Sequence, residues 1–146
     1  MNKVLFRTEG LPVPDWIKKA EKFVYKVLDT LDLKNWELSV LFCSNSYIKS
    51  LNAQYRGKDE ATDVLSFSLG TKLPGGRYLA GDIVISLDAL EENVRFFQVS
   101  AEEELRRLLI HGILHLAGFD HSTNRAEEPM LKTQEEILFR LAEKDL

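Results

Sequence analysis

The chain has 146 residues, the size of one domain with a full hydrophobic core. Its net charge of −4 excludes nucleic-acid binding through overall attraction, so contact with a polyanion requires a local basic patch. No apolar run reaches the length of a membrane span, and the N-terminus lacks a signal-peptide pattern. We therefore expect a cytoplasmic protein with no membrane partner.

Two strands and one helix are predicted at the N-terminal end. Strand-forming residues predict a short strand over Lys3–Arg7. Apolar residues at the helical period predict a helix over Trp16–Leu31, with Asp15 as its N-terminal cap. Alternation predicts a strand over Trp36–Cys43. Cys43, the one cysteine of the chain, is expected to be a core thiol rather than a nucleophile.

A helix and two further strands are predicted next. Ser44 or Ser46 is expected to cap the helix, which has one apolar side. The strands are predicted over Val64–Leu69 and Tyr78–Ser86. The turn-rich segment Leu73–Gly76 joins them.

Helices dominate the C-terminal part. A helix is predicted over Leu87–Phe97. Ser100 is expected to cap the next helix, and the acidic run Glu102–Glu104 suits its positive N-terminal end. A last amphipathic helix is predicted over Ala126–Glu143, where Pro129 fits only near the first turn.

These elements predict a single α+β domain over residues 1–146. A mixed sheet of about four strands is expected to pack against about five helices, with a buried histidine-bearing helix at the centre. Some parallel pairing is expected because helices and strands partly alternate. The strand order does not follow from the sequence.

All three histidines of the chain lie close together in one segment. His111 and His115 are four residues apart, so they lie on one face of the predicted helix. Gly118 lets the chain leave the helix and turn back toward His121. Three imidazoles placed in this way suit a divalent transition metal with one coordination position open.

The surroundings of the histidines also favour a metal. Leucines and isoleucines leave the helix apolar nearly all round, which is the pattern of a buried helix. Imidazoles there need partners, because an unsatisfied buried polar group costs roughly 1–3 kcal/mol. A metal satisfies both imidazoles of the helix at once, whereas the alternative is a separate hydrogen bond from each to a backbone carbonyl.

A second informative segment is Leu51–Leu69, which is loop-like between its helix and its strand. Arg56 is either a cation that suits the C-terminal end of the helix dipole or a guanidinium that clamps phosphate through paired N–H donors. Thr62 and Asp63 are candidates to hydrogen-bond a metal-bound imidazole or the loop itself.

The histidine spacing also matches the metzincin zinc proteases. Those enzymes carry a glutamate directly after the first histidine as general base, and here that position is Gly112. A metzincin-type protease is therefore disfavoured, and a metallohydrolase of another substrate class stays open.

The segment HGILHLAGFDH, from His111 to His121, resembles the signature H-G-x-L-H-L-x-G-[YF]-D-H of the YbeY-type endoribonucleases, the bacterial rRNA maturation factors. LNAQYRGKDEATDVLSF, from Leu51 to Phe67, is similar to a second block of that family, and GDIVIS, from Gly81 to Ser86, to a third. The blocks come in the family's order and cover the central half of the chain. Phe119, where many members have tyrosine, and Ser68, where many have proline, are minor departures.

This resemblance implies a zinc-dependent endoribonuclease that prefers single-stranded RNA. The implied role is 3′-end maturation of small-subunit rRNA and ribosome quality control. Arg56 corresponds to an arginine of the active cleft, and Asp63 and Asp120 are candidates to orient an imidazole or only to fix the turn. The implied metal ligands are His111, His115 and His121, of which His111 contributes to catalysis as a ligand of the active metal.

Several alternatives stay open. An all-imidazole site favours zinc but also accepts nickel, cobalt or copper. The nucleophile is either a metal-bound hydroxide or the ribose 2′-OH. A non-catalytic ribosome-assembly factor with a closed structural metal site would need Asp120 or Cys43 as a fourth ligand.

The expected partners are RNA, in particular rRNA of the small ribosomal subunit, and a ribosomal or assembly-factor protein. Basic residues in or beside the second block could form one rim of an RNA-binding cleft, namely Lys49, Arg56, Lys58, Lys72 and Arg77. The alternative is a solvated surface, where Asp59 and Glu60 cancel much of the positive field.

Overall fold

The computed structural model describes residues 1–120, 125 and 127–144. Within these residues the chain forms a four-stranded sheet and five α-helices, so the predicted α+β fold with a mixed sheet is confirmed. In chain order the elements are β1 (Lys3–Thr8), α1 (Ile17–Thr30), β2 (Trp36–Cys43), α2 (Asn45–Arg56), β3 (Val64–Lys72), β4 (Tyr78–Ser86), α3 (Leu87–Phe97), α4 (Ala101–Leu116) and α5 (Pro129–Lys144). No helix of the described part is long and apolar enough to cross a bilayer.

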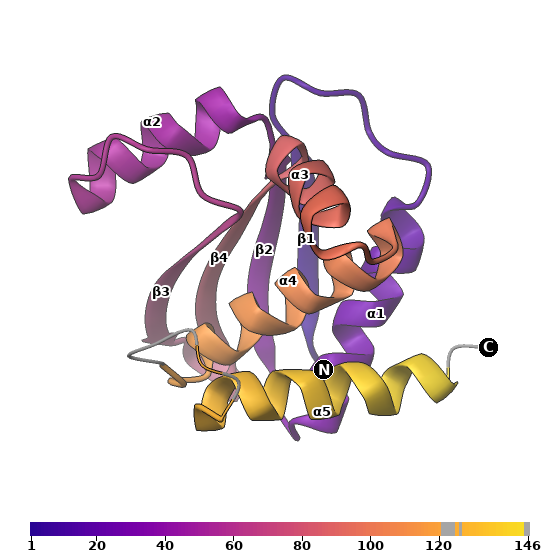
Figure 1. The fold of residues 1–146 in the computed structure, drawn as a ribbon. Coiled ribbons are helices and arrows are strands. Elements are labelled where there is room, and N and C mark those ends of the chain that lie inside the picture. Colours follow the sequence, from indigo (N-terminus) through magenta and orange to yellow (C-terminus); the bar gives the residue numbers. More distant parts are fainter. Residues whose placement is uncertain (121–124, 126, 145–146) are drawn as a thin grey trace.

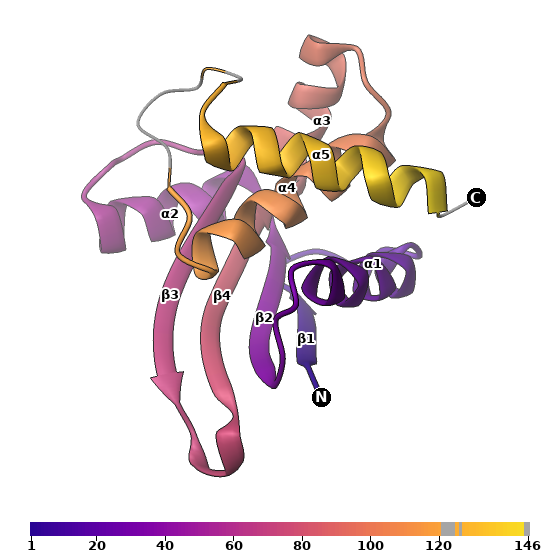
Figure 2. The same ribbon diagram turned by 90° about the horizontal axis from the view of Figure 1, so that it is seen from below.

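The strands lie in the order β1-β2-β4-β3. β1 pairs with β2 and β2 with β4 in parallel, whereas β3 pairs with β4 as an antiparallel hairpin. Figure 2 shows this hairpin extending beyond the ends of β1 and β2. β3 is therefore an edge strand with one side open to groups from outside the sheet.

Successive residues of the strands supply two apolar clusters on opposite faces of the sheet. Phe42, Ile83 and Ile85 belong to the main core, which they share with residues of α1, α4 and α5. Leu41 and Cys43 belong to a smaller cluster beneath α2, with Ile48, Leu65 and Val84. Figure 1 shows α4 crossing the sheet with α5 alongside it.

Gly112 allows α4 to lie unusually close to β4. A Cβ atom added at Gly112 would meet Cγ2 of Ile83 at 2.8 Å, and Ile83 itself is fully buried. Any side chain at this position therefore displaces the core. This contact explains why glycine follows the first histidine, and it leaves no room for the glutamate of the metzincin pattern.

Most predicted boundaries lie within one residue of those in the structure, and the larger differences concern the cap of α1, the end of β3 and the start of the last helix. Asp15 was expected to cap α1, but the N-cap is Trp16 without a side-chain bond, and the backbone N–H of Ile17 donates to the carbonyl of Pro14 at 3.2 Å instead. β3 continues to Lys72 after a register shift between Ser68 and Thr71.

The last helix begins later than the predicted Ala126, which lies outside the described residues. α5 begins at Pro129, whose fixed φ and missing N–H suit the first helical position. The caps predicted for the other helices are confirmed, since Ser44 accepts from the N–H of Tyr47 and Ser100 from that of Glu103.

Candidate functional site

Four of the predicted site residues meet in one pocket of about 400 Å³ between α4, β3 and the C-terminal end of α2. The structure brings together Arg56, His111, His115 and Asp120, which all line this pocket. Asp63 does not line it. His121 lies outside the described residues, so its predicted place beside the other two histidines stays a prediction.

The two histidines of α4 lie one turn apart and are half-buried. The ring centroids of His111 and His115 are 4.8 Å apart, with an interplanar angle of 71°. After them α4 ends at Leu116, and Gly118 follows the C-cap with a φ of +99°. The N–H of Gly118 donates to the carbonyl of His115 and that of Phe119 to the carbonyl of Leu114, which together form a Schellman turn. The predicted exit of the chain at Gly118 is therefore confirmed.

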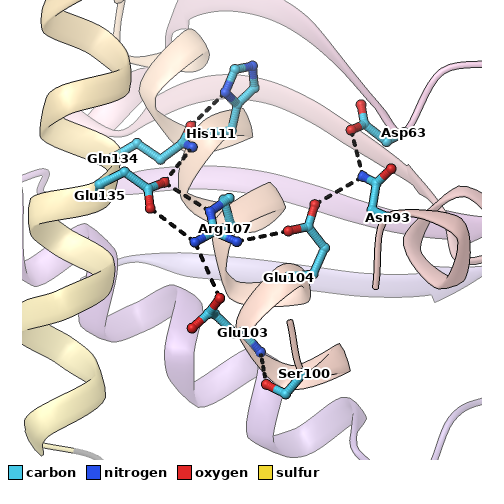
Figure 3. Close-up of polar contacts among 9 residues, drawn as sticks. All are labelled: Asp63, Asn93, Ser100, Glu103, Glu104, Arg107, His111, Gln134 and Glu135. Carbon is cyan, nitrogen blue, oxygen red and sulfur yellow. Dashed lines mark hydrogen bonds and ion pairs between the residues drawn. The ribbon is translucent and has the colours of Figure 1, made fainter. Parts of the chain in front are cut away.

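Gln134 of α5 contacts the first of these histidines. Its Oε1 lies 2.7 Å from Nδ1 of His111, and Gln134 is only 6% exposed (Figure 3). An amide oxygen only accepts hydrogen bonds, so Nδ1 is the donor and the lone pair of the ring is on Nε2. This arrangement fixes the tautomer and the orientation of His111.

Sequence reasoning missed Gln134, although the sequence contains a signal for it. Gln134 lies on the apolar stripe of α5, four residues after Met130 and three before Ile137, both of which are buried. A polar side chain on a buried stripe needs a partner. The identity of that partner depends on the packing of α5 against α4, which the sequence does not reveal.

Arg107 and Glu135 hold Gln134 in place. Nε2 of Gln134 donates to Glu135 at 3.1 Å. Glu135 in turn accepts two bonds from the guanidinium of Arg107, at 2.9 and 3.0 Å. Burial raises the pKa of the Glu135 carboxyl, but the bonds from Arg107 and Gln134 outweigh this effect and hold the pKa below its ordinary value.

The same arginine continues the network toward α3. Arg107 donates to Glu104 at 2.9 Å, and Glu104 is a carboxylate with only 3% exposure. Asn93 of α3 donates to Glu104 at 3.0 Å and to Asp63 at 3.1 Å (Figure 3). A continuous polar chain thus joins Asp63 to the residues that hold the histidine helix.

The placement of Asp63 matches one of its two predicted roles. Its carboxylate accepts from Asn93 and, at 3.5 Å, from the hydroxyl of Thr62, while its backbone carbonyl accepts from the N–H of Ser86. These contacts fix the loop between α2 and β3. The contact with an imidazole that the structure shows is made by Gln134 and not by Asp63.

Arg56 lies in the last turn of α2 and also on the pocket. Its Nη2 donates to the backbone carbonyl of Ser66 at 2.8 Å, and its guanidinium lies 5.8 Å from the centre of the Phe67 ring. The side chain remains exposed. Both interpretations of Arg56 are therefore compatible with its position.

The five cations predicted as a possible rim do not all lie at the histidine pocket. Of these five, only Arg56 lines the pocket. Lys72 and Arg77 lie at the tip of the β3–β4 hairpin, whereas Lys49 belongs to α2, at the opposite end of β3 (Figure 2). Arg77 also pairs with Glu37 at 2.8 Å. The charge offered to a polyanion at the pocket is thus local.

Cys43 is the core thiol that the sequence predicts. It is fully buried, and its Sγ lies 3.6 Å from the carbonyl oxygen of Ile85. Burial, and then the charge of Asp88, raise the pKa of the thiol to about 11. Cys43 lies in the cluster beneath α2 and does not line the histidine pocket, so it is not placed to be a fourth metal ligand there.

The part of the chain that the structure describes contains no group of three or more His, Cys, Asp or Glu side chains able to hold a metal ion. The two imidazoles it does describe fit two of the three predicted ligand positions. Imidazoles bound to one zinc at about 2.1 Å have ring centres about 5 Å apart. The observed 4.8 Å agrees with this spacing, and Gln134 gives His111 the outer hydrogen bond that metal-bound histidines usually make.

Comparison with known proteins identifies the family. The family model described as Endoribonuclease YbeY matches residues 6–142. The chain belongs to the YbeY family. The resemblance found in the three sequence blocks is thereby confirmed.

Individual YbeY proteins match over most of the chain. The Treponema denticola protein named Endoribonuclease YbeY is 52% identical over 84% of this chain and 81% of its own length. The Treponema pallidum protein of the same name is 45% identical over 94% of this chain and 89% of its own length. The solution structure of TM1509 from Thermotoga maritima matches with a TM-score of 0.68 and 29% identity, over 97% of this chain and 90% of that one.

Proposed function

We propose that this chain is a zinc-dependent endoribonuclease that cleaves single-stranded RNA, with small-subunit rRNA in the cytoplasm as its natural substrate. Membership of the YbeY family, whose members are named endoribonucleases, supports RNA as the substrate. The observation that carries the proposal is the meeting of an imidazole pair and a guanidinium in one pocket, although they come from α4 and α2. Imidazoles hold a transition metal, and a guanidinium binds phosphate.

His111, His115 and His121 would hold the metal. A bound zinc ion would supply a Lewis acid that activates the nucleophile and polarises the phosphoryl group. Within the chain, Gln134 keeps Nδ1 of His111 protonated and its Nε2 directed away from α5. Nickel, cobalt and copper are the alternative metals for the same ligands.

Arg56 would stabilise the negative charge that grows on the phosphoryl oxygens as the phosphodiester bond breaks. Its bond to the Ser66 carbonyl uses one of five N–H donors, and the others can point toward substrate. Asp120, also on the pocket, is exposed and is proposed to orient an imidazole. Weak intrinsic affinity for RNA is expected from this one local cation, so a ribosomal or assembly-factor protein would add contacts.

Gly112 argues against a protease. The general base of the metzincins would occupy this position, where even an added Cβ atom would meet Ile83. Water activation by a carboxylate at this point of the helix is therefore sterically excluded.

The proposal is tested with purified protein of measured metal content and a single-stranded oligoribonucleotide. Wild-type protein should cleave the RNA, and a chelator should abolish cleavage until zinc is restored. His115→Ala should lose both zinc and cleavage, whereas Arg56→Glu should keep zinc and the fold but lose cleavage. Undiminished cleavage by His115→Ala would identify a contaminating nuclease, and a peptide library cut by the wild type would indicate a protease instead.

A further inference from the structure

An exposed aromatic ring lies directly beside Arg56, just outside the pocket. Tyr55, the preceding residue of α2, is 63% exposed. Its ring meets that of Phe67 of β3 edge to face, with centroids 5.5 Å apart and an interplanar angle of 67°. The guanidinium of Arg56 lies 5.8 Å from the centre of the same Phe67 ring. We call these three residues the Tyr55 cluster.

The Tyr55 cluster is continuous with the histidine pocket around the open edge of β3. Ser66 and Phe67 are successive residues of this strand, so their side chains point to opposite faces of the sheet. Ser66 lines the pocket, and its hydroxyl donates to the carbonyl of Gly112 at 3.3 Å. Arg56, which binds the Ser66 carbonyl and also approaches the Phe67 ring, lies between the two faces.

Packing does not account for the ring of Tyr55. Phe67 is half-buried and packs against the cluster beneath α2, whereas Tyr55 leaves most of its surface to solvent. An exposed aromatic next to a cation is the combination by which proteins bind single-stranded nucleic acid. The cation meets the backbone phosphate and the ring stacks on a base.

We propose that Tyr55 is the stacking surface for an unpaired nucleobase adjacent to the phosphate that Arg56 contacts. This inference rests on the proposed function and names the part of the site that selects single-stranded RNA. A base in a duplex has both faces covered by its neighbours, so only an unpaired base can stack on Tyr55. Every base has a π face, so the subsite tolerates many sequences.

The first test compares variants of Tyr55 on a single-stranded oligoribonucleotide. Tyr55→Ala should raise KM about tenfold with little change in kcat, because stacking anchors the substrate without taking part in bond breaking. Tyr55→Leu should behave like Tyr55→Ala, since it keeps apolar surface but has no ring. Tyr55→Phe and Tyr55→Trp should keep the wild-type KM.

The matched control is Phe96→Ala. Phe96 is 81% exposed and forms a similar edge-to-face pair with Phe97 of α3, with centroids 5.0 Å apart, but it does not line the histidine pocket. Removing this ring should leave KM unchanged. Thermal unfolding of all variants checks that the fold is intact.

The second test removes the base instead of the ring. A series of substrates carries one abasic nucleotide each, at successive positions. At one of these positions the KM of the wild type should rise about tenfold, whereas the KM of Tyr55→Ala should not rise further. A 2-aminopurine at that position should lose fluorescence on binding to wild type but not to Tyr55→Ala.

The outcomes separate the subsite from the proposed function. Wild-type cleavage of RNA with equal KM values for wild type and Tyr55→Ala would overturn the subsite alone. An abasic penalty that is the same in both proteins would overturn it as well. A wild-type protein that neither binds nor cleaves RNA would overturn both proposals.

Discussion

Oε1 of Gln134 lies 2.7 Å from Nδ1 of His111, and this contact, like the Arg107–Glu135 ion pair, joins α5 to the histidine helix. The contact is nearly excluded from water, because Gln134 is only 6% exposed. It therefore fixes which nitrogen of His111 can bind a metal.

This contact predicts that Gln134→Leu lowers zinc affinity by about 10–100-fold, because Nδ1 loses its acceptor and the ring its orientation. Gln134→Glu keeps an oxygen in the same place and should retain most of the affinity. Competition with a chromophoric chelator measures both variants. Equal affinities for Gln134→Leu and wild type would show that the contact is only structural.

Gly112 predicts a loss of stability on substitution. Gly112→Ala gains up to about 1 kcal/mol of helix propensity but overpacks Ile83 at a cost of about 1–3 kcal/mol. The free energy of unfolding should therefore fall by about 1 kcal/mol, as measured with urea. Ile83→Ala should lower the free energy of unfolding less in the Gly112→Ala background than in the wild type, because the two side chains overlap. Additive effects of the two substitutions would show that the contact does not limit residue 112.

The ion pair of Arg107 and Glu135 predicts a pH dependence of stability. The pKa of Glu135 is lowered in the folded protein from its ordinary 4.5, so the pair stabilises the fold fully above that pH. The contribution is lost as the pH falls through the lower folded pKa. Urea unfolding between pH 3 and 7 should show that the free energy of unfolding falls less at acid pH for Glu135→Gln than for wild type. Identical dependence of this free energy on pH in both proteins would rule the ion pair out as a contributor.

Cys43 predicts a thiol that reacts only after unfolding. Its pKa is raised to about 11, mainly by burial, so almost no thiolate exists at pH 8. A disulfide reagent should modify the one thiol of the protein in urea and, over the same time, leave the native protein unmodified. Rapid reaction of the native protein would show that the β2 end opens locally.

Local patterns were sufficient for most of the fold. The limits of β2, β4 and α3 were predicted to the residue, because each has a clear apolar period and a turn or cap at its ends. Asp15 failed as a cap because a backbone bond from Ile17 satisfies the helix start. β3 runs longer than predicted because pairing with β4 extends it beyond its apolar residues.

The candidate site could be predicted from local pattern only where the interacting residues lie close together in the sequence. His111 and His115 share a helix face, so their proximity follows from spacing alone. The position of Arg56 beside the histidines was predicted from the family resemblance and not from the local sequence pattern. Gln134 was missed because its place on the buried stripe of α5 indicates only that it has a partner, and the identity of that partner depends on how α5 packs against α4.

The hydrogen bond that anchors the guanidinium of Arg56 is accepted by the main-chain oxygen of Ser66 and not by a side-chain atom. Every amino acid supplies that oxygen, so the strand can exchange its side chain at this position while the cation stays anchored. The tolerance ends only with changes that move the backbone of β3 itself. A mutational scan should therefore find that substitutions of Ser66 leave Arg56 in place. Substitutions that alter the backbone of β3 should displace it.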